Sequence, residues 1–373
     1  MKKIKLRSKE WFDNPKDPGL TALYLERYLN YGLKRKDLQS GKPIIGIAQS
    51  GSDLSPCNRH ILDLSKNIKK GIVNAGGVPM EFPTHPIQET GKRPTAALDR
   101  NLSYLSLVEV LYGYPLDGVV LTTGCDKTTP AALMAAATVN IPSIILSGGP
   151  MLDGHYKGQK AGSGTIIWEA RKLYSKGEID YDQFMDMATA SSPSVGHCNT
   201  MGTASTMNSI AEALGMSLPG CAIIPAPYPE RKKISYKTGQ RIVNMVRENL
   251  TPSKIMTKKA FENAVIVASA IGGSSNATTH LLAIAKHMGI KFDLSNWQKL
   301  GHKIPLLVDC QPAGKYLMEG FYKAGGVPAV MKELIKNKKL NVKVKTVTGK
   351  NLGQNLKSKI KVNSKVIKTF KKN

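Results

Sequence analysis

Short apolar segments, polar loops and amphipathic segments follow one another in a regular order along the middle of the chain. From Pro43, the apolar run PIIGIAQ precedes the polar loop SGSDLSPCNRH, and residues 60–74 then carry apolar side chains at helical spacing. The run predicts a strand and the spacing predicts a helix, which residues 75–77 (AGG) end. The apolar positions expected near one face of this helix are Ile61, Leu62, Leu64, Ile68 and Ile72.

The same order recurs twice further along the chain. Residues 118–123 (GVVLTT) predict a strand, 130–139 (PAALMAAATV) a helix and 142–149 (PSIILSGG) another strand, with Thr129 as N-cap and Pro130 as the first helical residue. Residues 264–270 (AVIVASA) predict a further strand, which precedes the loop IGGSSN and a helix over 277–289. Such units are typical of an α/β fold with a mainly parallel sheet flanked by helices, whose ligands lie at the carboxyl ends of the strands.

The two ends of the chain differ from this middle part. Residues 7–33 are rich in Tyr and Leu and predict a helical arm, whereas the last 43 residues are rich in Lys. We therefore divide the chain into an N-terminal helical arm (1–42), an α/β domain (43–340) and a Lys-rich segment (341–373).

Composition places the chain among globular proteins. It has 373 residues, 41% of them hydrophobic, and no apolar run long enough to span a membrane. The N-terminus has basic residues without the apolar stretch of a secretory signal, so we expect a cytoplasmic protein that does not bind membranes. Five cysteines scattered along the sequence do not form the dense framework of a small disulfide-linked protein.

The formal net charge of +26 raises the possibility of nucleic-acid binding. Half of this excess lies between Met331 and Asn373, where fourteen Lys accompany a single acid, Glu333. The other half is spread over the rest of the chain without a basic helix or a basic stretch containing aromatic residues. This distribution favours a solvated, Lys-rich surface over a nucleic-acid site.

Three of the cysteines lie in polar loops near the predicted starts of helices: Cys57 in SPCNRH, Cys125 in TGCDKTTP and Cys198 in GHCNTMG. A helix N-terminus favours the thiolate, which is the form that binds iron. A lone cysteine is more often a core residue, but three in matching contexts favour a shared ligand role. Cys221 and Cys310 have apolar neighbours, and we assign them to the core.

The spacing of these cysteines matches no zinc ribbon or ferredoxin, but the motifs around them are specific. The segments GIAQSGSDLSPCNRH, LTTGCDKTTPAALMAA and GHCNTMGTASTMNSIAEALGMSLPG are similar, nearly residue by residue, to the family of dihydroxy-acid, phosphogluconate and sugar-acid dehydratases. The resemblance extends from about Arg7 to about Lys365. The CNTMG form of the third motif resembles the sugar-acid branch, and the segments RSKEWFDNP and PAPYPERKKISYKTGQRIV are most similar to pentonate (D-xylonate) dehydratases.

The resemblance implies two cofactors. Cys57, Cys125 and Cys198 would hold an iron-sulfur cluster, for which we expect [2Fe–2S] rather than [4Fe–4S], with one iron open to substrate. Glu89, Asp126 and Lys127 match the family's Mg²⁺ ligands, the lysine as a carbamate. For Asp126 and Lys127, an ordinary ion pair in a loop is the alternative, and Glu89 rests on the resemblance alone. The implied reaction is the dehydration of an aldonate to a 2-keto-3-deoxy acid.

Members of the family are longer than this chain and carry a second, β-rich domain, which supplies another Mg²⁺ ligand and a serine base. Neither has a counterpart here, so the resemblance assigns no catalytic base. We expect a truncated or split enzyme in which the apolar residues of the Lys-rich segment lack cover and a separate chain supplies the missing domain. By resemblance we also expect a homodimer.

Two alternative functions remain open at this point. The chain could be a dihydroxy-acid dehydratase of branched-chain amino-acid synthesis, or an inactive iron-sulfur or subunit-interaction protein. Among the other polar residues, Ser274, Ser275 and Asn276 open a predicted helix and could bind an anion or only cap it. His197 could tune the cluster or only fill space. The segment GSGTII from Gly162 lacks the third glycine of a dinucleotide-binding motif and argues against NAD.

Overall fold

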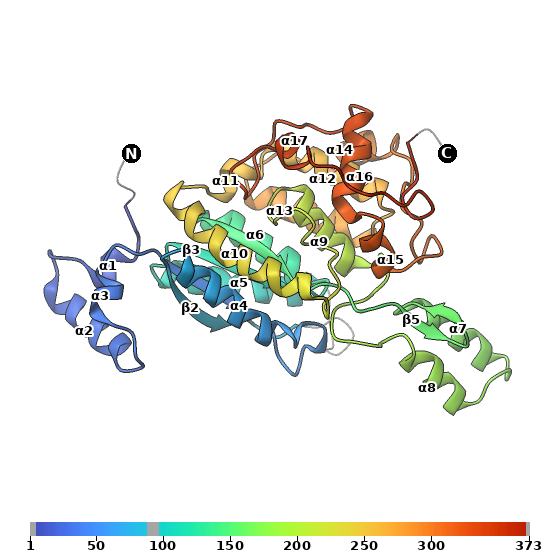
Figure 1. The fold of residues 1–373 in the computed structure, drawn as a ribbon, viewed down its shortest axis with the longest axis horizontal. Helices are drawn as coiled ribbons and strands as arrows, with labels where there is room; N and C mark the ends of the chain where they lie inside the picture. The colour runs from blue at the N-terminus through green and yellow to red at the C-terminus, as the bar shows by residue number, and fades with distance from the viewer. Residues whose placement is uncertain (1–4, 88–96, 371–373) are drawn as a thin grey trace.

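The computed structural model describes residues 5–87 and 97–370, and its centre is a parallel four-stranded sheet. The strands lie in the order β2-β1-β3-β4 (Figure 1), so the expected α/β fold with a parallel sheet is confirmed. Pairing is in register at Ile44 with Val78, Ile45 with Gly118 and Val119 with Ser143. The strands are β1 (Ile44–Gln49), β2 (Val78–Pro83), β3 (Gly118–Thr123) and β4 (Ser143–Ser147).

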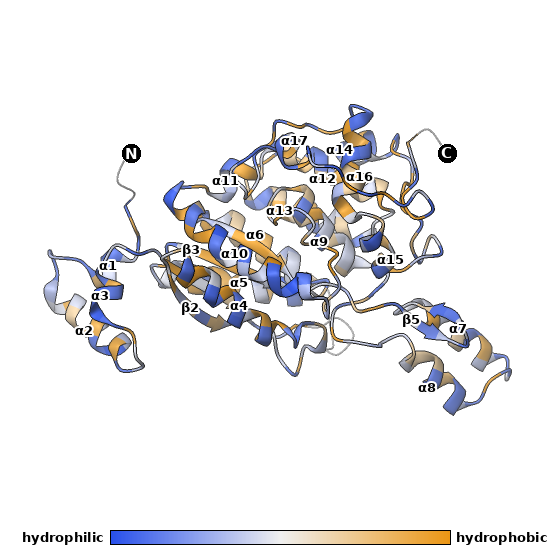
Figure 2. Cartoon of the chain, viewed as in Figure 1, coloured by the Kyte–Doolittle hydropathy of each residue, from blue (hydrophilic) through white to orange (hydrophobic). Residues whose placement is uncertain are grey.

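Helices cover both faces of this sheet, and as a result β1, β3 and β4 are buried along their whole length. Helices α4 (Ile61–Asn74) and α10 (Pro229–Arg247) pack together and contact the sheet. Helix α5 (Ala97–Gly113) packs on α6 (Thr128–Val139), which contacts β3 and β4. Right-handed crossovers put the two pairs on opposite faces. Figure 2 shows the apolar character of the central elements.

A helical layer lies over α6 and completes the main core (Figure 1). At its centre, α9 packs against α6, α12, α13 and α16. The helices that follow β4 in this layer are α9 (Thr203–Ala213), α11 (Pro252–Ile255), α12 (Lys258–Ala270), α13 (Asn276–His287), α14 (Leu294–Gly301), α15 (Met318–Lys323), α16 (Gly326–Lys336) and α17 (Leu352–Asn355).

Two smaller parts project from the body (Figure 1). The N-terminal arm contains α1 (Lys9–Phe12), α2 (Pro18–Leu29) and α3 (Arg35–Leu38), and Trp11 stacks on Tyr24 with ring centroids 4.0 Å apart. The second projection has a small apolar cluster of its own, which includes Ala161, Ile166 and Met187. It consists of β5 (Gly154–Tyr156), β6 (Gln159–Ala161), α7 (Thr165–Ser175) and α8 (Tyr181–Thr189).

The strand predicted for residues 264–270 is wrong, because these residues form the second half of α12. The helix is buried on nearly every side, from Ala260 to Ala270. An apolar run with this burial has no polar face to reveal the helical period, and its valines and isoleucine suggested a strand instead. The helix expected after it is present as α13.

Three smaller expectations also need correction. Thr129 is not the N-cap and Pro130 is not the first helical residue, because α6 begins at Thr128 with Lys127 at the N-cap position, and the Thr129 hydroxyl donates to Asn208 Oδ1. Leu62 is exposed at the surface of α4, unlike the other four apolar positions that were expected near the same face. Most apolar residues of the Lys-rich segment do not lack cover, although Val362 is exposed: Val344, Val347, Leu352, Leu356, Val366 and Ile367 are buried in the main core.

The part of the chain that the structure describes has no helix whose length and apolar character would let it traverse a lipid bilayer.

Candidate functional site

The carboxyl ends of β1 and β3 lie side by side at the centre of the sheet, and the chain leaves them in opposite directions. From β1 it crosses to β2 on one side, and from β3 it crosses to β4 on the other. Ligands of open α/β sheets bind at such a point. Cys57 lies in the short helix η1 (Pro56–Asn58) of the loop after β1, and Cys125 lies two residues beyond β3.

The structure brings the three predicted cysteines into one cluster. A hydrogen bond with the Cys125 thiol and burial raise the pKa of the Cys57 thiol, with further electrostatic contributions from Cys125 and Cys198. The helix starts were expected to favour thiolates, but in this chain mutual repulsion and burial outweigh that effect at Cys57. The thiolate forms of these three cysteines would repel one another. A cationic metal centre would neutralise their negative charge, so the arrangement fits a metal site.

Backbone and side-chain contacts lock the Cys57 and Cys125 loops together. Asn58, next to Cys57, accepts a hydrogen bond on Oδ1 from the Cys125 backbone N–H at 3.0 Å. A Cβ added at Gly124 would lie 2.2 Å from this same oxygen, so the position has no room for a side chain. The neighbours of the cysteines therefore fix how closely the two loops approach.

A second set of contacts ties the Cys198 loop to the end of β3. The Asn208 side chain on α9 donates to Gly124 O at 3.1 Å and lies 3.3 Å from His197 Nε2, while its Oδ1 accepts from Thr123. Because the amide nitrogen is a donor, His197 Nε2 accepts, and its Nδ1–H donates to Cys198 O at 3.0 Å. Burial lowers the pKa of His197 to about 3, which keeps the ring neutral. His197 therefore orients the backbone of Cys198.

The segment after β4 accepts hydrogen bonds from His60 and His197, which lie next to the Cys57 and Cys198 loops. His60 Nε2 donates to Gly148 O at 2.8 Å, and the His197 N–H donates to Gly149 O at 3.0 Å. The fully buried guanidinium of Arg231 holds this segment through Ser147 O at 2.6 Å and also donates to Cys221 O at 2.8 Å. A buried cation thus fixes carbonyl groups around the site.

Asp126 and Lys127, two of the predicted Mg²⁺ ligands, lie beside Cys125 and are buried. Lys127 Nζ donates to Asp126 Oδ2 at 3.1 Å, with 4% and 5% of the two side chains exposed, and the Cys125 thiol donates to Asp126 Oδ1 at 3.2 Å. An ion pair on a solvated loop, the alternative reading, does not describe this degree of burial. Glu89, the third predicted ligand, lies outside the described residues.

Within residues 5–87 and 97–370, no group of three or more His, Cys, Asp or Glu side chains is arranged to hold a metal ion. The predicted Mg²⁺ ligands include Glu89, which lies outside the described residues, and a carbamate on Lys127. Neither belongs to a group made only of described His, Cys, Asp and Glu side chains. The irons of a cluster take their own thiolates and share bridging sulfide, so the three cysteines need not converge on one point. Sulfur donors beside oxygen donors fit a soft and a hard metal centre side by side.

Two residues near Lys127 escaped the sequence analysis. His280 on α13 is 4% exposed and lies 3.1 Å from Arg100 Nη1, through its Nδ1. Burial, together with the charges of Arg100 and Lys127, lowers the pKa of His280 to about 3. In the sequence, His280 lies among other polar residues of the predicted helix, such as Thr278 and Thr279, and no motif distinguishes it.

Other candidate residues lie at the edges of the site. The Ser163 hydroxyl, inside the segment considered for NAD, donates to Cys198 Sγ at 3.4 Å and so joins the projecting α7 part to the cysteine cluster. Ser274 hydrogen bonds with Thr203 at 2.9 Å, and no side-chain hydrogen bond from Ser275 caps α13. Cys221 and Cys310 are buried in the core, as expected.

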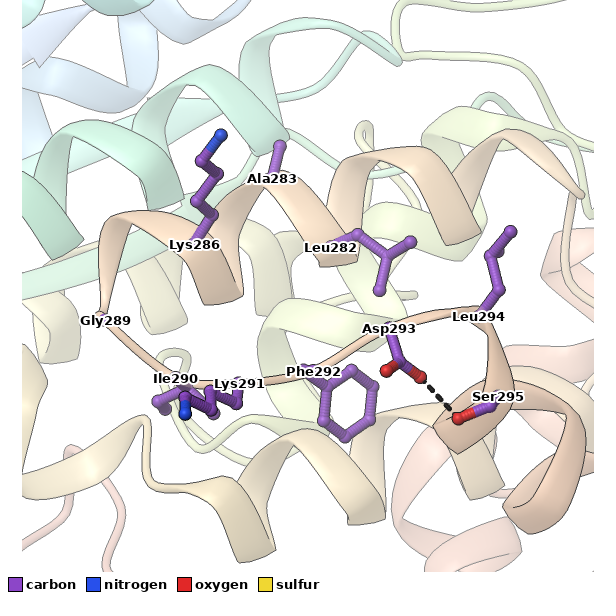
Figure 3. Close-up of a pocket in the computed structure, with 10 residues that line it drawn as sticks. All are labelled: Leu282, Ala283, Lys286, Gly289, Ile290, Lys291, Phe292, Asp293, Leu294 and Ser295. Atoms are coloured by element: carbon purple, nitrogen blue, oxygen red, sulfur yellow. Dashed lines mark hydrogen bonds between the residues drawn. The ribbon is translucent and has the colours of Figure 1, made fainter.

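A hollow on the described surface lies away from these residues. It measures about 720 Å³ and lies between α13 and α14, where Figure 3 shows Asp293 hydrogen bonded to Ser295 at its edge. None of its lining residues comes from the cysteine loops or from Asp126 and Lys127. It is open to solvent and mainly apolar, which suits neither a sugar acid nor a metal ion.

Comparison with known proteins matches this chain to dehydratases of a single family. Residues 42–355 match the family model described as dihydroxy-acid/6-phosphogluconate dehydratase N-terminal. The chain is 59% identical to a D-xylonate dehydratase of Caulobacter vibrioides, over 95% of this chain and 60% of the relative. It is 45% identical to an L-arabinonate dehydratase of Rhizobium leguminosarum, over 97% of this chain and 62% of the relative. A dihydroxy-acid dehydratase of Halothermothrix orenii is 38% identical, over 90% and 62% of the two chains. The chain thus spans about three fifths of the length of these relatives.

Proposed function

Because the chain belongs to the dihydroxy-acid/6-phosphogluconate dehydratase family, we propose that it carries the cluster-binding and metal-binding part of a hydro-lyase that dehydrates a sugar acid. The observation that carries the proposal is the gathering of Cys57, Cys125 and Cys198 beside Asp126 and Lys127, at the point where the strand order of the sheet reverses. The reaction removes the C2 proton and the 3-hydroxyl of the acid, and the enol then ketonises.

Sequence identity supports a pentonate as the substrate. The match to the D-xylonate dehydratase is 59% identical, against 38% for the dihydroxy-acid dehydratase. A polyhydroxylated substrate also suits a site lined by amide and hydroxyl groups. The branched-chain dihydroxy acid is the alternative substrate.

The donor sets support two bound groups: a cluster, proposed as [2Fe–2S], on Cys57, Cys125 and Cys198, and Mg²⁺ on Asp126, Glu89 and carbamylated Lys127. When bound, an iron with an open coordination position supplies a Lewis acid for the leaving hydroxyl, and Mg²⁺ supplies a hard cation for the substrate carboxylate. Cys57 and Cys198 are partly exposed and Cys125 is buried, so substrate would approach from one side.

The protein itself contributes burial and positioning. Asp126 is held by Cys125 and Lys127 in a site that excludes most water, where electrostatic interactions are stronger than in solution. Asn58 and His197 keep the cysteine loops in place through backbone groups. The site is therefore organised before a substrate arrives.

The test is the release of 2-keto acid by the anaerobically purified protein with Mg²⁺, from D-xylonate, L-arabinonate and 2,3-dihydroxyisovalerate. Asp126→Asn removes a carboxylate ligand, and Asp63→Asn on the exposed surface of α4 is the matched control. We expect the wild type to release 2-keto acid from a sugar acid. Asp126→Asn should lower the rate of release at least about 100-fold, comparable to the loss of one preorganised electrostatic contact. Asp63→Asn should leave the rate unchanged.

Because no base is assigned in this chain, equilibrium binding of D-xylonate is measured on the same samples. Binding that needs Asp126 supports the proposed site even when turnover is slow. A preference for the branched-chain acid, or neither binding nor turnover with any sugar acid, would contradict the proposal.

The expected homodimer and a separate chain that supplies a second domain stay predictions. Light scattering on the purified protein gives its mass in solution and tests the first. Co-purification of a second polypeptide that raises keto-acid release tests the other.

A further inference from the structure

Three helices meet next to Lys127. Lys127 directly precedes α6, and α6 packs against both α5 and α13 (Figure 1). Arg100 lies in the first turns of α5 and His280 near the start of α13. Both side chains are buried, with 6% and 4% of their surface exposed. A buried Arg and a buried His at a helix junction require hydrogen-bond partners.

The contact between Arg100 and His280 fixes which ring nitrogen carries the proton. Arg100 Nη1 lies 3.1 Å from His280 Nδ1, and a guanidinium can only donate. His280 Nδ1 must therefore accept, and the proton of the neutral ring lies on Nε2. The guanidinium is itself held by Asn101 Oδ1, at 3.2 Å from Nε and 3.0 Å from Nη2.

The Nε2–H of His280 is a buried donor for which the described residues provide no acceptor. Leaving such a donor without an acceptor is unfavourable, and the charges that act on the ring are those of Arg100 and Lys127, both positive. A buried donor among cations is a place for an oxygen anion. Lys127 as an ammonium cannot serve, because it has donors only.

We propose that His280 Nε2–H donates a hydrogen bond to a carboxylate-type oxygen at the Lys127 site, with Arg100 as the positioning residue that sets the ring proton. This inference rests on the proposed function, which provides two sources of such an oxygen: a carbamate on Lys127 and the carboxylate of the sugar acid. The two share one chemistry, a planar anion with two oxygens.

Carbamate formation would turn Lys127 into an acceptor. The ammonium first loses one proton to water. The neutral Nζ then attacks the carbon of CO₂, an N–C bond forms, one C=O electron pair moves onto oxygen, and a second proton leaves the nitrogen to water. The cationic side chain becomes an anion, so its repulsion from Arg100 becomes attraction. The anion then needs donors, and His280 Nε2–H is one that is already buried and oriented.

The test compares His280→Phe, which keeps a ring but removes the donor, with His280→Gln, whose amide nitrogen can replace Nε2–H. His287→Phe is the control, since His287 lies on the same helix and contacts Thr138 at 3.0 Å, away from Lys127. Carbamate is followed by ¹³C NMR during titration with ¹³C-bicarbonate and Mg²⁺, without substrate. Binding of D-xylonate is measured separately, and circular dichroism checks the folding of each variant.

We expect His280→Phe to weaken one of these two equilibria by about tenfold or more, as for a lost hydrogen bond to a charged group. His280→Gln should recover most of the loss, and His287→Phe should match the wild type. A shift in the bicarbonate midpoint alone identifies the carbamate as the acceptor, and a shift in D-xylonate affinity alone identifies the substrate carboxylate.

The inference is overturned when the wild type forms the carbamate and binds D-xylonate, and both His280 variants do the same with unchanged midpoints. A wild type that shows neither equilibrium is a different result. It overturns the proposed function first, and the inference with it. Should His280→Phe not fold, unchanged midpoints in His280→Asn, which lacks a donor at the Nε2 position, overturn the inference equally.

Discussion

Single residues around the site owe their state to burial more than to their chemical type. Burial raises the pKa of Glu212 to about 7, although its carboxylate accepts hydrogen bonds from Gly220 N and Ala222 N at 2.7 and 2.9 Å. Its neighbour Arg231 is buried as well and donates to backbone carbonyls rather than to this carboxylate. Glu212 therefore titrates near neutral pH inside the core.

The raised pKa of Glu212 predicts a pH-dependent loss of stability. Below about pH 4.5, the carboxyl is protonated in both the folded and the unfolded chain. Between that pH and 7 only the folded chain holds the proton, so the free energy of unfolding falls as pH rises, by about 3 kcal/mol in total. Glu212→Gln mimics the protonated form and removes this fall.

Denaturant unfolding of the wild type and Glu212→Gln between pH 5 and 8 measures the effect. The free energy of Glu212→Gln relative to the wild type should rise by about 2 to 3 kcal/mol across this range. For Glu10→Gln on the exposed α1, the difference should stay constant. Parallel curves for Glu212→Gln and the wild type would show that the carboxyl is ionised throughout.

The sequence revealed the residues whose neighbours form recognisable motifs and missed those that act through space. Cys57, Cys125 and Cys198 were singled out because each lies in a polar loop near the start of a predicted helix, within a motif that resembles the family. His280 lies inside a helix and Arg100 is separated from it by 180 positions, so only the packing of α5 and α13 against α6 brings them together. Asn208 was missed for the same reason.

At the scale of elements, a short apolar run between polar segments was taken as a strand, which was correct for β1, β3 and β4 and wrong for α12. Helix α4 and the strands β1, β3 and β4 lie where the spacing of apolar residues placed them. Helix α12 was taken for a strand, because burial on nearly all sides leaves no helical period in its sequence. Strand β2 was not predicted at all. It lies at the edge of the sheet and is only partly buried, so its residues form no apolar run.

Helices α4 and α10 approach closely through glycine, and this contact predicts a clear effect of substitution. A Cβ added at Gly239 would lie 2.2 Å from Ile68 O, and one added at Gly71 would lie 2.1 Å from Tyr236 O. Gly239→Ala must therefore push the helices apart, and we expect a loss of about 2 kcal/mol despite the higher helix propensity of Ala.

Gly19→Ala in α2 is the matched control, because its Cβ would meet only Asp17 Oδ1, at 4.0 Å. It should leave the free energy of unfolding unchanged or raise it by up to about 1 kcal/mol. Denaturant unfolding of both variants decides the matter. Equal stability of Gly239→Ala and the wild type would mean that the two helices have room between them.

At the scale of the whole molecule, the fold brings together loops that the sequence keeps apart. The reversal of strand order puts the loops after β1 and β3 side by side, and α9 carries the Cys198 loop to them through Asn208 and His197. The segment after β4, held by Arg231, supports this assembly. The parallel sheet could be predicted from the sequence, but the order of its strands could not, because order depends on which helices cover each face.

Whether these three loops together bind one iron-sulfur cluster is decided by measuring iron and acid-labile sulfide in the anaerobically purified protein. We expect the visible absorption spectrum of a cluster in the wild type, its loss in Cys125→Ser, and its retention in Cys310→Ser, because Cys310 lies in the core with its thiol 3.8 Å from Leu317 O. A wild type without iron and sulfide, or a cluster that survives in Cys125→Ser, would mean that the three loops do not form a cluster site.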